Sequence, residues 1–164
     1  MKTITKIIYN KTLLFQCLLL SLIPLFTEAQ LKKGINFINP TGTYRLDAKT
    51  EIKDGETYGY SGNIKVKLLD SSKIVIYLFV CKGAPSYNSG SFLDTIPYSK
   101  NIAIYRTPEE DASCKIILYF TKKGIKVEQY QDNLNYGCSF GHGVFADGYY
   151  KKVSSKIPII TEDE

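Results

Sequence analysis

The segment CSFGHGVFADGYY at residues 138–150 holds the single histidine of the chain, His142, between two glycines. Its spacing to Cys138 and Asp147 raises three interpretations: a metal ligand, a catalytic base, or an ordinary loop residue. A zinc site needs three or four protein ligands, mostly Cys and His. The chain offers one His, and we expect two of the nearby cysteines to be joined in a disulfide. We therefore predict no metal and no cofactor.

A catalytic role for His142 requires a nucleophile and an orienting group that converge on it. Ser89, in the segment YNSGS, lacks the strand-to-helix turn that exposes a nucleophilic serine. The acidic cluster at residues 109–111 lacks the alternating oxygen ligands and the glycine of a calcium loop. We predict that the protein is not an enzyme, and an enzyme with His142 as base remains the alternative.

The segment GAPSYNSG at residues 83–90 is a second candidate site. It places one aromatic residue among small hydrogen-bonding residues, between two apolar segments that we expect to be strands. Function concentrates in loops on rigid scaffolds, and tyrosine supplies rigid contact area. A plain long turn is the alternative. The predicted binding residues are Tyr87, Asn88, Ser89 and His142.

Strand patterns dominate the chain after residue 42. Residues 63–69 (NIKVKLL) alternate apolar and polar side chains, as a half-buried strand does. Residues 73–81 (KIVIYLFVC) are continuously apolar after the first lysine, which indicates a strand covered on both faces, and we expect residues 31–37 to fold across it. The expected strands are 42–46, 60–69, 73–81, 92–98, 101–107, 113–121, 125–130 and 144–153.

Eight strands joined by short loops predict an all-β fold, an antiparallel up-and-down meander that closes into a small calycin-like barrel. Closure removes exposed sheet edges. A two-sheet β-sandwich is the alternative. Asp147-Gly148 is either a hairpin turn or, as we prefer, a bulge after which the strand continues, so that Tyr150 pairs beside Tyr44. The inward-facing residues are large and apolar, which favours a filled interior: Ile64, Val66, Leu68, Ile116, Leu118 and Phe120.

The N-terminal region indicates export. Residues 1–11 are basic, residues 12–26 (TLLFQCLLLSLIPLF) are mostly apolar, and Thr27-Glu28-Ala29 fits a signal-peptidase site. An uncleaved single-span anchor is the alternative, although the apolar segment is shorter than the about 20 residues that a bilayer needs. We predict a periplasmic or extracellular protein with no membrane span after cleavage. Its parts are a signal peptide (1–29), a segment covering the sheet (30–41), a barrel (42–153) and a mobile tail (154–164).

Cleavage after residue 29 removes three of the 21 basic and one of the 16 acidic residues, which leaves 18 against 15 and a formal charge of +3. A nucleic-acid groove would gather basic side chains on one face and interleave aromatic ones. The lysines are instead dispersed along the chain, so we predict no nucleic-acid partner. Examples on the solvent side of expected strands are Lys65, Lys67, Lys126, Lys151 and Lys152.

Three cysteines remain after cleavage: Cys81, Cys114 and Cys138. In an oxidising compartment this number allows one internal disulfide and one free thiol. We favour Cys114 with Cys138, because they bracket an expected hairpin. Closing a loop of about 25 residues would stabilise the fold by about 3 kcal/mol. Cys81 ends a very apolar strand and is expected to be a small buried thiol.

These residues form a pattern that resembles small exported bacterial proteins of uncharacterised function, some of them similar to domains that accompany lysozyme-inhibitor-like modules in envelope proteins. The resemblance spans most of residues 42–153 and implies a β-barrel, the Cys114–Cys138 bridge and an envelope or secreted setting. It rests on Gly42-x-Tyr44, on Gly-x-Pro-Ser-x-Asn-x-Gly at 83–90, on Cys114, and on Cys138-x-Phe140-Gly141-x-x-Val144-x-x-Asp147-Gly148-x-Tyr150.

The sequence therefore predicts an exported, non-catalytic binding module for a protein or cell-wall partner. Its most concrete form is a lysozyme-inhibitor-like role. The formal charge of +3 argues against that form, because lysozymes are usually basic and like charges slow association. A small-molecule carrier that uses the barrel interior is the alternative.

Overall fold

The computed structural model describes residues 36–107 and 109–161, and the predicted signal peptide lies outside these ranges. The described residues form nine β-strands and no helix. The strands are β1 (Gly42–Leu46), β2 (Glu51–Lys53), β3 (Glu56–Asp70), β4 (Lys73–Gly83), β5 (Ser89–Ser99), β6 (Ile102–Thr107), β7 (Asp111–Phe120), β8 (Gly124–Tyr130) and β9 (Gly148–Ser154).

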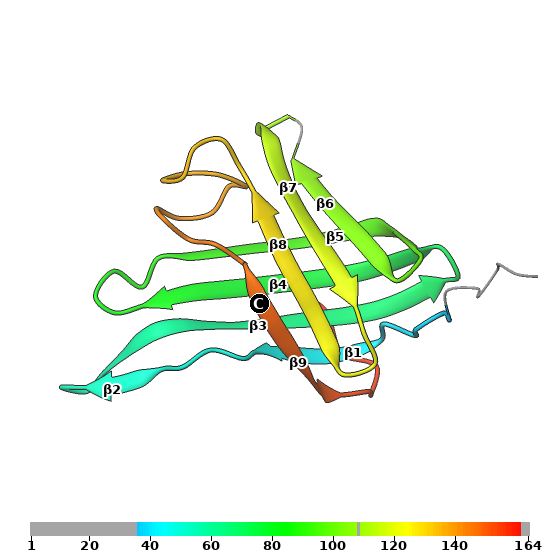
Figure 1. Cartoon of the computed structure of the whole chain (residues 1–164), viewed down its shortest axis with the longest axis horizontal. Helices are drawn as coiled ribbons and strands as arrows, with labels where there is room; N and C mark the ends of the chain where they lie inside the picture. Colours follow the sequence, from blue (N-terminus) through cyan, green and yellow to red (C-terminus); the bar gives the residue numbers. More distant parts are fainter. Residues whose placement is uncertain (1–35, 108, 162–164) are drawn as a thin grey trace, which may run out of the picture. The chain divides into compact units, whose positions relative to one another are not determined.

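Eight of the strands form a closed antiparallel barrel (Figure 1). Each strand from β3 to β9 is hydrogen-bonded to the next, and β1 pairs with both β9 and β3, so that the sheet closes on itself. The short strand β2 pairs only with β3, outside the closed ring. The predicted all-β meander and barrel are confirmed, and the sandwich alternative is excluded because the sheet has no break.

The two ends of the barrel are built differently (Figure 1). At the turn end, residues 71–72, 100–101 and 121–123 connect consecutive strands by short turns. At the loop end, residues 84–88 connect β4 to β5, and residues 131–147 connect β8 to β9. The loop end also includes the β2–β3 hairpin and the β6–β7 turn. We use the names turn end and loop end for these two sets of residues below.

Apolar side chains fill the barrel interior. Of the six residues expected to face inward, five are buried and Leu68 is partly buried against them. The ring of Phe120 packs edge-on against Tyr98 and Tyr44, with centroids 5.2 and 6.4 Å apart. The largest fully buried side chains are Tyr44, Tyr98, Tyr150, Ile64, Ile74, Ile76, Leu78, Ile116, Leu118, Ile125, Val66 and Val80.

The described part of the N-terminal segment crosses the turn end and is tied to buried tyrosines. The Tyr98 hydroxyl donates to the carbonyl of Ile38, and the Tyr44 hydroxyl donates to that of Pro40, both at 2.6 Å. The side chain of Asn101 accepts from the Ile38 amide at 2.9 Å. Burial raises the pKa of Tyr98 to about 12 and raises that of Tyr44 further, so both hydroxyls keep their protons and donate.

Segments from both ends of the described chain lie near β4 and β5. Only the last two residues of the expected cover, 31–37, are described, and Phe37 packs edge-on against Tyr98 at the turn end. Ile160 of the C-terminal tail lines a surface hollow together with Val75 of β4. The tail therefore lies beside β4. The mobility predicted for residues 154–164 stays a prediction.

The start of the last strand differs from the prediction. Residues 144–147 belong to the irregular loop, and β9 begins at Gly148. The strand continues through Tyr150, so the interpretation of Asp147-Gly148 as a hairpin turn is wrong. The preferred interpretation as a bulge is also wrong, because no strand precedes Gly148. Tyr150 pairs with Leu46, and Tyr44 pairs with Lys152, two residues further along β9 than expected.

The hairpin formed by β2 and β3 was not predicted. Asp54 and Gly55 form its turn with φ angles of 54° and 84°. Two consecutive positive φ values suit the type I′ turn that matches the twist of a hairpin, and Asp-Gly is a preferred pair there. The segment was missed because β2 has only three residues, all exposed.

Candidate binding rim at the loop end

Two loops that are far apart in the sequence meet at the loop end. The side-chain amide of Asn88 donates to the carbonyl of His142 at 2.9 Å, across a separation of 54 residues. The backbone amide of Gly141 donates to the carbonyl of Ser89 at 2.9 Å. The structure thus brings the predicted binding residues Asn88 and His142 into direct contact, with Ser89 bonded to the neighbour of His142, and it fixes the 84–88 loop against the 131–147 loop.

Tyr87, the fourth predicted residue, lies on the outer side of the 84–88 loop with its side chain 46% exposed. Its hydroxyl accepts a hydrogen bond from the amide of Thr57 at 3.3 Å, and its own amide donates to Gly83 at 2.8 Å. The free thiol of Cys81 lies 3.7 Å from the Tyr87 carbonyl. The ring is therefore held in place while one side faces solvent.

His142 is exposed, and its ring packs edge-on against Tyr136 at 5.1 Å. The side chains of Tyr136 and Leu134 are 62% and 69% exposed. The sequence analysis missed both residues, because they lie in a segment that reads as a polar loop. The signal in the sequence was two large side chains in a polar segment: Leu134 lies between two asparagines, and Tyr136 follows the second of them. They become surface features because the loop that carries them is anchored at other points.

The disulfide between Cys114 and Cys138 anchors the 131–147 loop to β7, as predicted. Beside it, the carboxylate of Asp111 accepts from the Ser113 hydroxyl at 2.6 Å and from the Cys138 amide at 3.0 Å. The Ser113 hydroxyl and then the Cys138 amide hold the pKa of Asp111 below its usual value, because they bond the ionised form. Ser139 adds a hydrogen bond from its hydroxyl to Glu110.

The disulfide also holds an unusual backbone. Cys138 and Ser139 have φ angles of 56° and 58°, a left-handed conformation that non-glycine residues seldom adopt. The amide of Phe140 donates to the carbonyl of Gly137 at 3.0 Å, which closes a tight turn around them. Such a conformation costs on the order of 1 kcal/mol or more per residue and persists only when its surroundings fix it.

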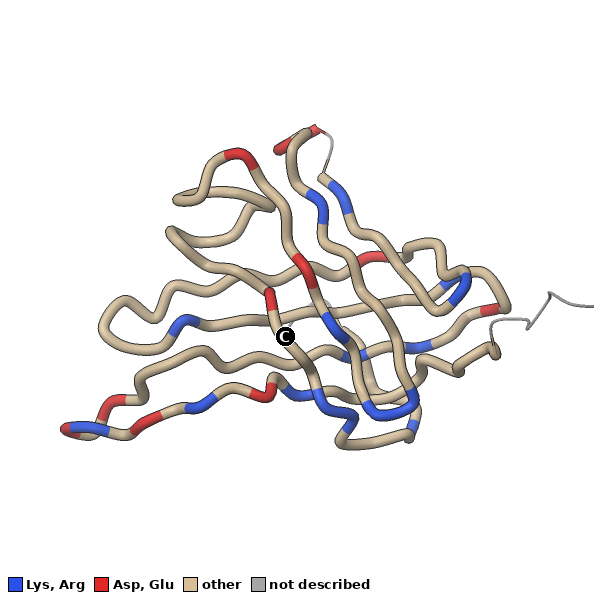
Figure 2. Tube along the Cα trace, in the orientation of Figure 1, with Lys and Arg blue, Asp and Glu red and all other residues tan. Residues whose placement is uncertain are grey.

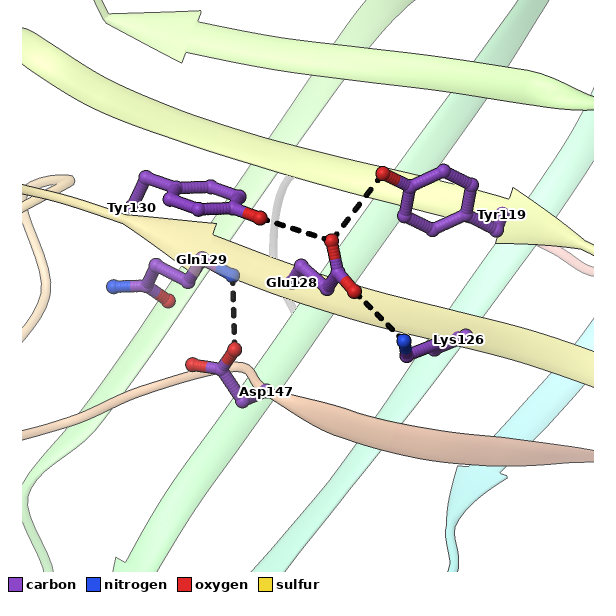
Figure 3. Close-up of polar contacts among 6 residues, drawn as sticks. All are labelled: Tyr119, Lys126, Glu128, Gln129, Tyr130 and Asp147. Carbon is purple, nitrogen blue, oxygen red and sulfur yellow. Dashed lines mark hydrogen bonds and ion pairs between the residues drawn. The ribbon is translucent and has the colours of Figure 1, made fainter.

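Gln129 ties the other end of the loop to β8. Its side-chain oxygen accepts from the backbone amide of Ala146 at 2.8 Å. Its backbone amide donates to the Asp147 carboxylate at 3.0 Å (Figure 3). Gln129 is only 9% exposed, so these bonds satisfy groups that water does not reach easily. Residues 144–147 therefore have side-chain partners in place of a neighbouring strand.

Phe140 closes the loop end of the barrel. Its ring is 4% exposed and lies over Gly90 of β5, where an added Cβ would come within 2.2 Å of the ring. Nearby, the hydroxyl of Tyr60 donates to the carbonyl of Gly143 at 2.8 Å. The barrel interior is thus covered at this end by the loop itself.

A polar cluster on the outer face of β7 and β8 is satisfied internally (Figure 3). Glu128 accepts from the hydroxyls of Tyr119 at 3.2 Å and Tyr130 at 3.0 Å, and it forms an ion pair with Lys126 at 2.7 Å. These donors, Lys126 first, lower the pKa of Glu128. Because the Glu128 carboxylate is bonded to three donors, it joins β7 to β8 and is not placed to act as a general base.

Opposite charges separate between the two ends (Figure 2). Acidic residues gather at the loop end, on the β2–β3 hairpin, the β6–β7 turn and the 131–147 loop, where they outnumber Lys49, Lys53, Lys82 and Arg106. The exposed acidic residues there are Glu51, Asp54, Glu56, Glu109, Glu110, Asp132 and Asp147. The three turns of the turn end contain Lys100, Lys122 and Lys123 and no acidic residue.

Among residues 36–107 and 109–161, no group of three or more His, Cys, Asp or Glu side chains is placed to hold a metal ion. The same part of the chain contains no helix that is long and apolar enough to cross a bilayer. The disulfide fits an oxidising compartment.

No protein-family model matches the chain, and neither the curated proteins nor the solved structures include a significant match to it. The resemblance to exported bacterial proteins therefore stays a prediction. We interpret the rim from its own geometry.

Proposed function

We propose that this chain is an exported, non-catalytic binding module that engages a protein partner through the loop end. One observation carries the proposal: Tyr87, Tyr136 and Leu134 are exposed on two loops whose backbones are bonded to each other and to the barrel. Aromatic residues are the usual anchors of protein interfaces. Because the loops are already ordered, binding loses less conformational entropy than it would with mobile loops.

The charge distribution favours a basic partner. A small positive net charge would disfavour such a partner if it were spread evenly. Acidic residues of the loop end instead lie on the same segments as the exposed aromatic residues: Glu56 precedes Thr57, whose amide bonds to Tyr87, and Asp132 lies in the loop that carries Tyr136. Complementary charge around an interface accelerates association and selects partners. A lysozyme-inhibitor-like role in the periplasm or outside the cell, with a basic cell-wall hydrolase as the partner, is the most concrete form of the proposal.

The two alternatives have less support. A carrier needs space inside the barrel, and the interior holds fully buried Tyr44, Tyr98 and Tyr150 among many aliphatic side chains. An enzyme that uses His142 needs a convergent nucleophile. Ser89 contacts the His142 loop through its backbone carbonyl, which bonds to the amide of Gly141, and the cysteines nearest in sequence are oxidised.

The proposal is tested with the exported protein and a lysozyme. Inhibition of lysozyme-catalysed lysis and direct binding by biolayer interferometry are measured at micromolar protein. The Tyr87→Ala/Tyr136→Ala double variant is expected to weaken binding by about tenfold or more, since each change removes an exposed anchor. The matched control is Leu69→Ala/Ile157→Ala, which removes exposed apolar side chains away from the loop end and should leave binding unchanged.

The outcomes separate the versions of the proposal. Absence of inhibition and of binding removes the lysozyme version. A pull-down with purified cell-wall sacculi then tests the cell-wall version, with the same two double variants. Absence of binding to both probes, or equal losses in the rim variant and the control, contradicts a binding function for the loop end.

A further inference from the structure

The turn end contains a second candidate site, which does not depend on the proposed function of the loop end. A surface hollow of about 570 Å³ lies between the β7–β8 turn and the end of β9. A volume of this size lies in the range of small-molecule sites, roughly 300–1,000 Å³. Four lysines, three residues with a hydroxyl group and one valine line it: Lys122, Lys123, Lys151, Lys152, Tyr149, Ser154, Ser155 and Val153.

Three of these lysines lack a carboxylate partner. Lys151 forms an ion pair with Asp47 at 2.8 Å. Within the described ranges, Lys122, Lys123 and Lys152 form no ion pair with an acidic side chain. Like charges that line one hollow repel one another, and none of the described residues that line it is acidic. An anion in the hollow would relieve that repulsion.

The backbone that carries the lysines is fixed. The Thr121 hydroxyl accepts from the amides of Lys123 at 3.3 Å and Gly124 at 3.0 Å, which orders the turn. The amide of Lys152 donates to the carbonyl of Lys123 at 2.9 Å, which joins the turn to β9. Gly124 is required in this arrangement, because an added Cβ would lie 2.7 Å from the Tyr149 ring. The backbone positions of Lys123 and Lys152 are therefore fixed relative to each other at the hollow.

Lys152 is the most enclosed of the four. Its ammonium lies 5.4 Å from the centroid of the Tyr44 ring, a buried aromatic surface. Burial lowers the pKa of Lys152, because a partly desolvated ammonium has lost part of its hydration. A bound anion would restore that stabilisation. The sequence analysis placed Lys152 on the solvent side of a strand, and its position over Tyr44 was not foreseen.

We propose that this lysine-lined hollow binds a ligand that carries two or more neighbouring phosphate groups. Lysine ammonium groups are common phosphate ligands, acting as point charges from several directions. Two adjacent phosphates match a cluster of three unpaired lysines in charge better than a single carboxylate does. The hydroxyl of Tyr149, which lies 3.4 Å from that of Thr121, adds a neutral hydrogen-bonding group at the same wall.

The same phosphate chemistry occurs in a soluble phosphorylated ligand and in the headgroups of an anionic lipid surface. Figure 2 shows that the basic positions continue around the turn end, which both sources would accommodate. The experiment therefore has two arms. Inorganic pyrophosphate is titrated into the exported protein by calorimetry. Vesicles of phosphatidylglycerol, with phosphatidylcholine vesicles for comparison, are tested by co-sedimentation.

Lys122→Gln/Lys123→Gln is the test variant, and both lysines are exposed, so the fold is expected to remain intact. Binding to the effective probe should weaken at least about tenfold, as expected for the loss of two charge-assisted contacts. The control, Lys49→Gln/Lys53→Gln, changes the net charge equally at the loop end and should alter binding less than about twofold. A second test variant, Lys152→Gln, should also weaken binding, and thermal melts verify that each variant is folded.

The arms decide the source and the validity of the site. Saturable binding of pyrophosphate assigns the hollow to a soluble phosphorylated ligand, and selective sedimentation with phosphatidylglycerol assigns it to a lipid surface. Binding of neither probe overturns the proposal. Equal weakening by the control variant also overturns it, because binding would then follow net charge and not the hollow.

Discussion

The two ends of this barrel solve the same problem in opposite ways. Each must connect neighbouring strands and satisfy the backbone groups that leave the sheet. The turn end uses two- and three-residue turns whose bonds are local, such as the Thr121 hydroxyl with the amides that follow it. The loop end uses 17 consecutive residues, 131–147, whose backbone is bonded to distant side chains. The turn end is therefore stabilised by many local bonds, and the loop end is stabilised by a few long-range contacts.

This difference has a functional consequence. A loop held by long-range anchors can present Tyr136 and Leu134 to solvent without itself becoming disordered. A tight turn cannot present such a surface, but it can hold charged residues at fixed positions, as the lysines at 122 and 123 show. The loop end is thus suited to shape-dependent recognition and the turn end to charge-dependent recognition. Removing an anchor should accordingly cost more at the loop end than at the turn end.

The largest effect is expected from removing the disulfide. The Cys114→Ala/Cys138→Ala variant loses a cross-link between residues separated by 24 positions. The chain-entropy argument gives a loss of about 3 to 4 kcal/mol in the free energy of unfolding. Denaturant unfolding, followed by fluorescence of the tyrosines, measures it. Reduction of the unchanged protein should reproduce the loss, and a loss below about 1 kcal/mol would mean that the loop is held mainly by its other bonds.

Gly90→Ala is expected to have the next largest effect. The added methyl group would lie 2.2 to 2.6 Å from three atoms of the Phe140 ring, so the ring must move out of the barrel end. Overpacking of this kind costs about 1–3 kcal/mol. Thermal or denaturant unfolding measures the loss. The control is the double variant Gly90→Ala/Phe140→Leu, in which the smaller side chain should relieve the clash. Its loss of stability should then be less than the sum of the losses of the two single variants.

The sequence indicated the regular parts of the molecule better than the loop end. Apolar and alternating segments bounded by turn residues identified seven of the barrel strands closely, because an inward residue is apolar whatever its partner. The same pattern misplaced the start of β9: Val144 and Ala146 are buried as strand residues would be, but their amides donate to the Gly141 carbonyl and to the Gln129 side chain and not to a neighbouring strand. A sequence period reports which side chains are buried, and it does not report what bonds the backbone.

The candidate sites were less accessible to prediction, for a related reason. Asn88 and His142 were singled out separately, but their contact depends on how two loops 54 residues apart are brought together by the barrel. The lysines appeared dispersed, because the turns that carry them meet only in the closed sheet. Cys81, expected to be buried, is partly exposed beside the 84–88 loop. Contacts between loops follow from closure, which local patterns do not encode.

A smaller, pH-dependent effect is expected from Asp111→Asn. The pKa of Asp111 is lower in the folded chain than the usual value of an aspartate, so the carboxylate stabilises the fold above that usual value. This contribution is lost as the pH falls through the lowered pKa. Thermal melts at neutral pH and near pH 3 should show a stability difference between the variant and the unchanged protein that shrinks with acidification. A difference that stays constant would mean that the charge of Asp111 does not hold Cys138.

The smallest effect is expected from Thr121→Ala at the turn end. The change removes a hydroxyl that accepts from the amides of Lys123 and Gly124, but the turn is exposed, so water replaces the lost acceptor. A loss of about 0.5–1 kcal/mol is expected, typical of one net hydrogen bond. Denaturant unfolding alongside the disulfide variant gives the comparison directly. A loss as large as that of the disulfide variant would mean that the turn end is also held by one dominant contact, and the contrast between the two ends would be wrong. If instead the stability loss is small but pyrophosphate binding weakens, the hydroxyl acts by positioning the lysines and contributes little to the fold.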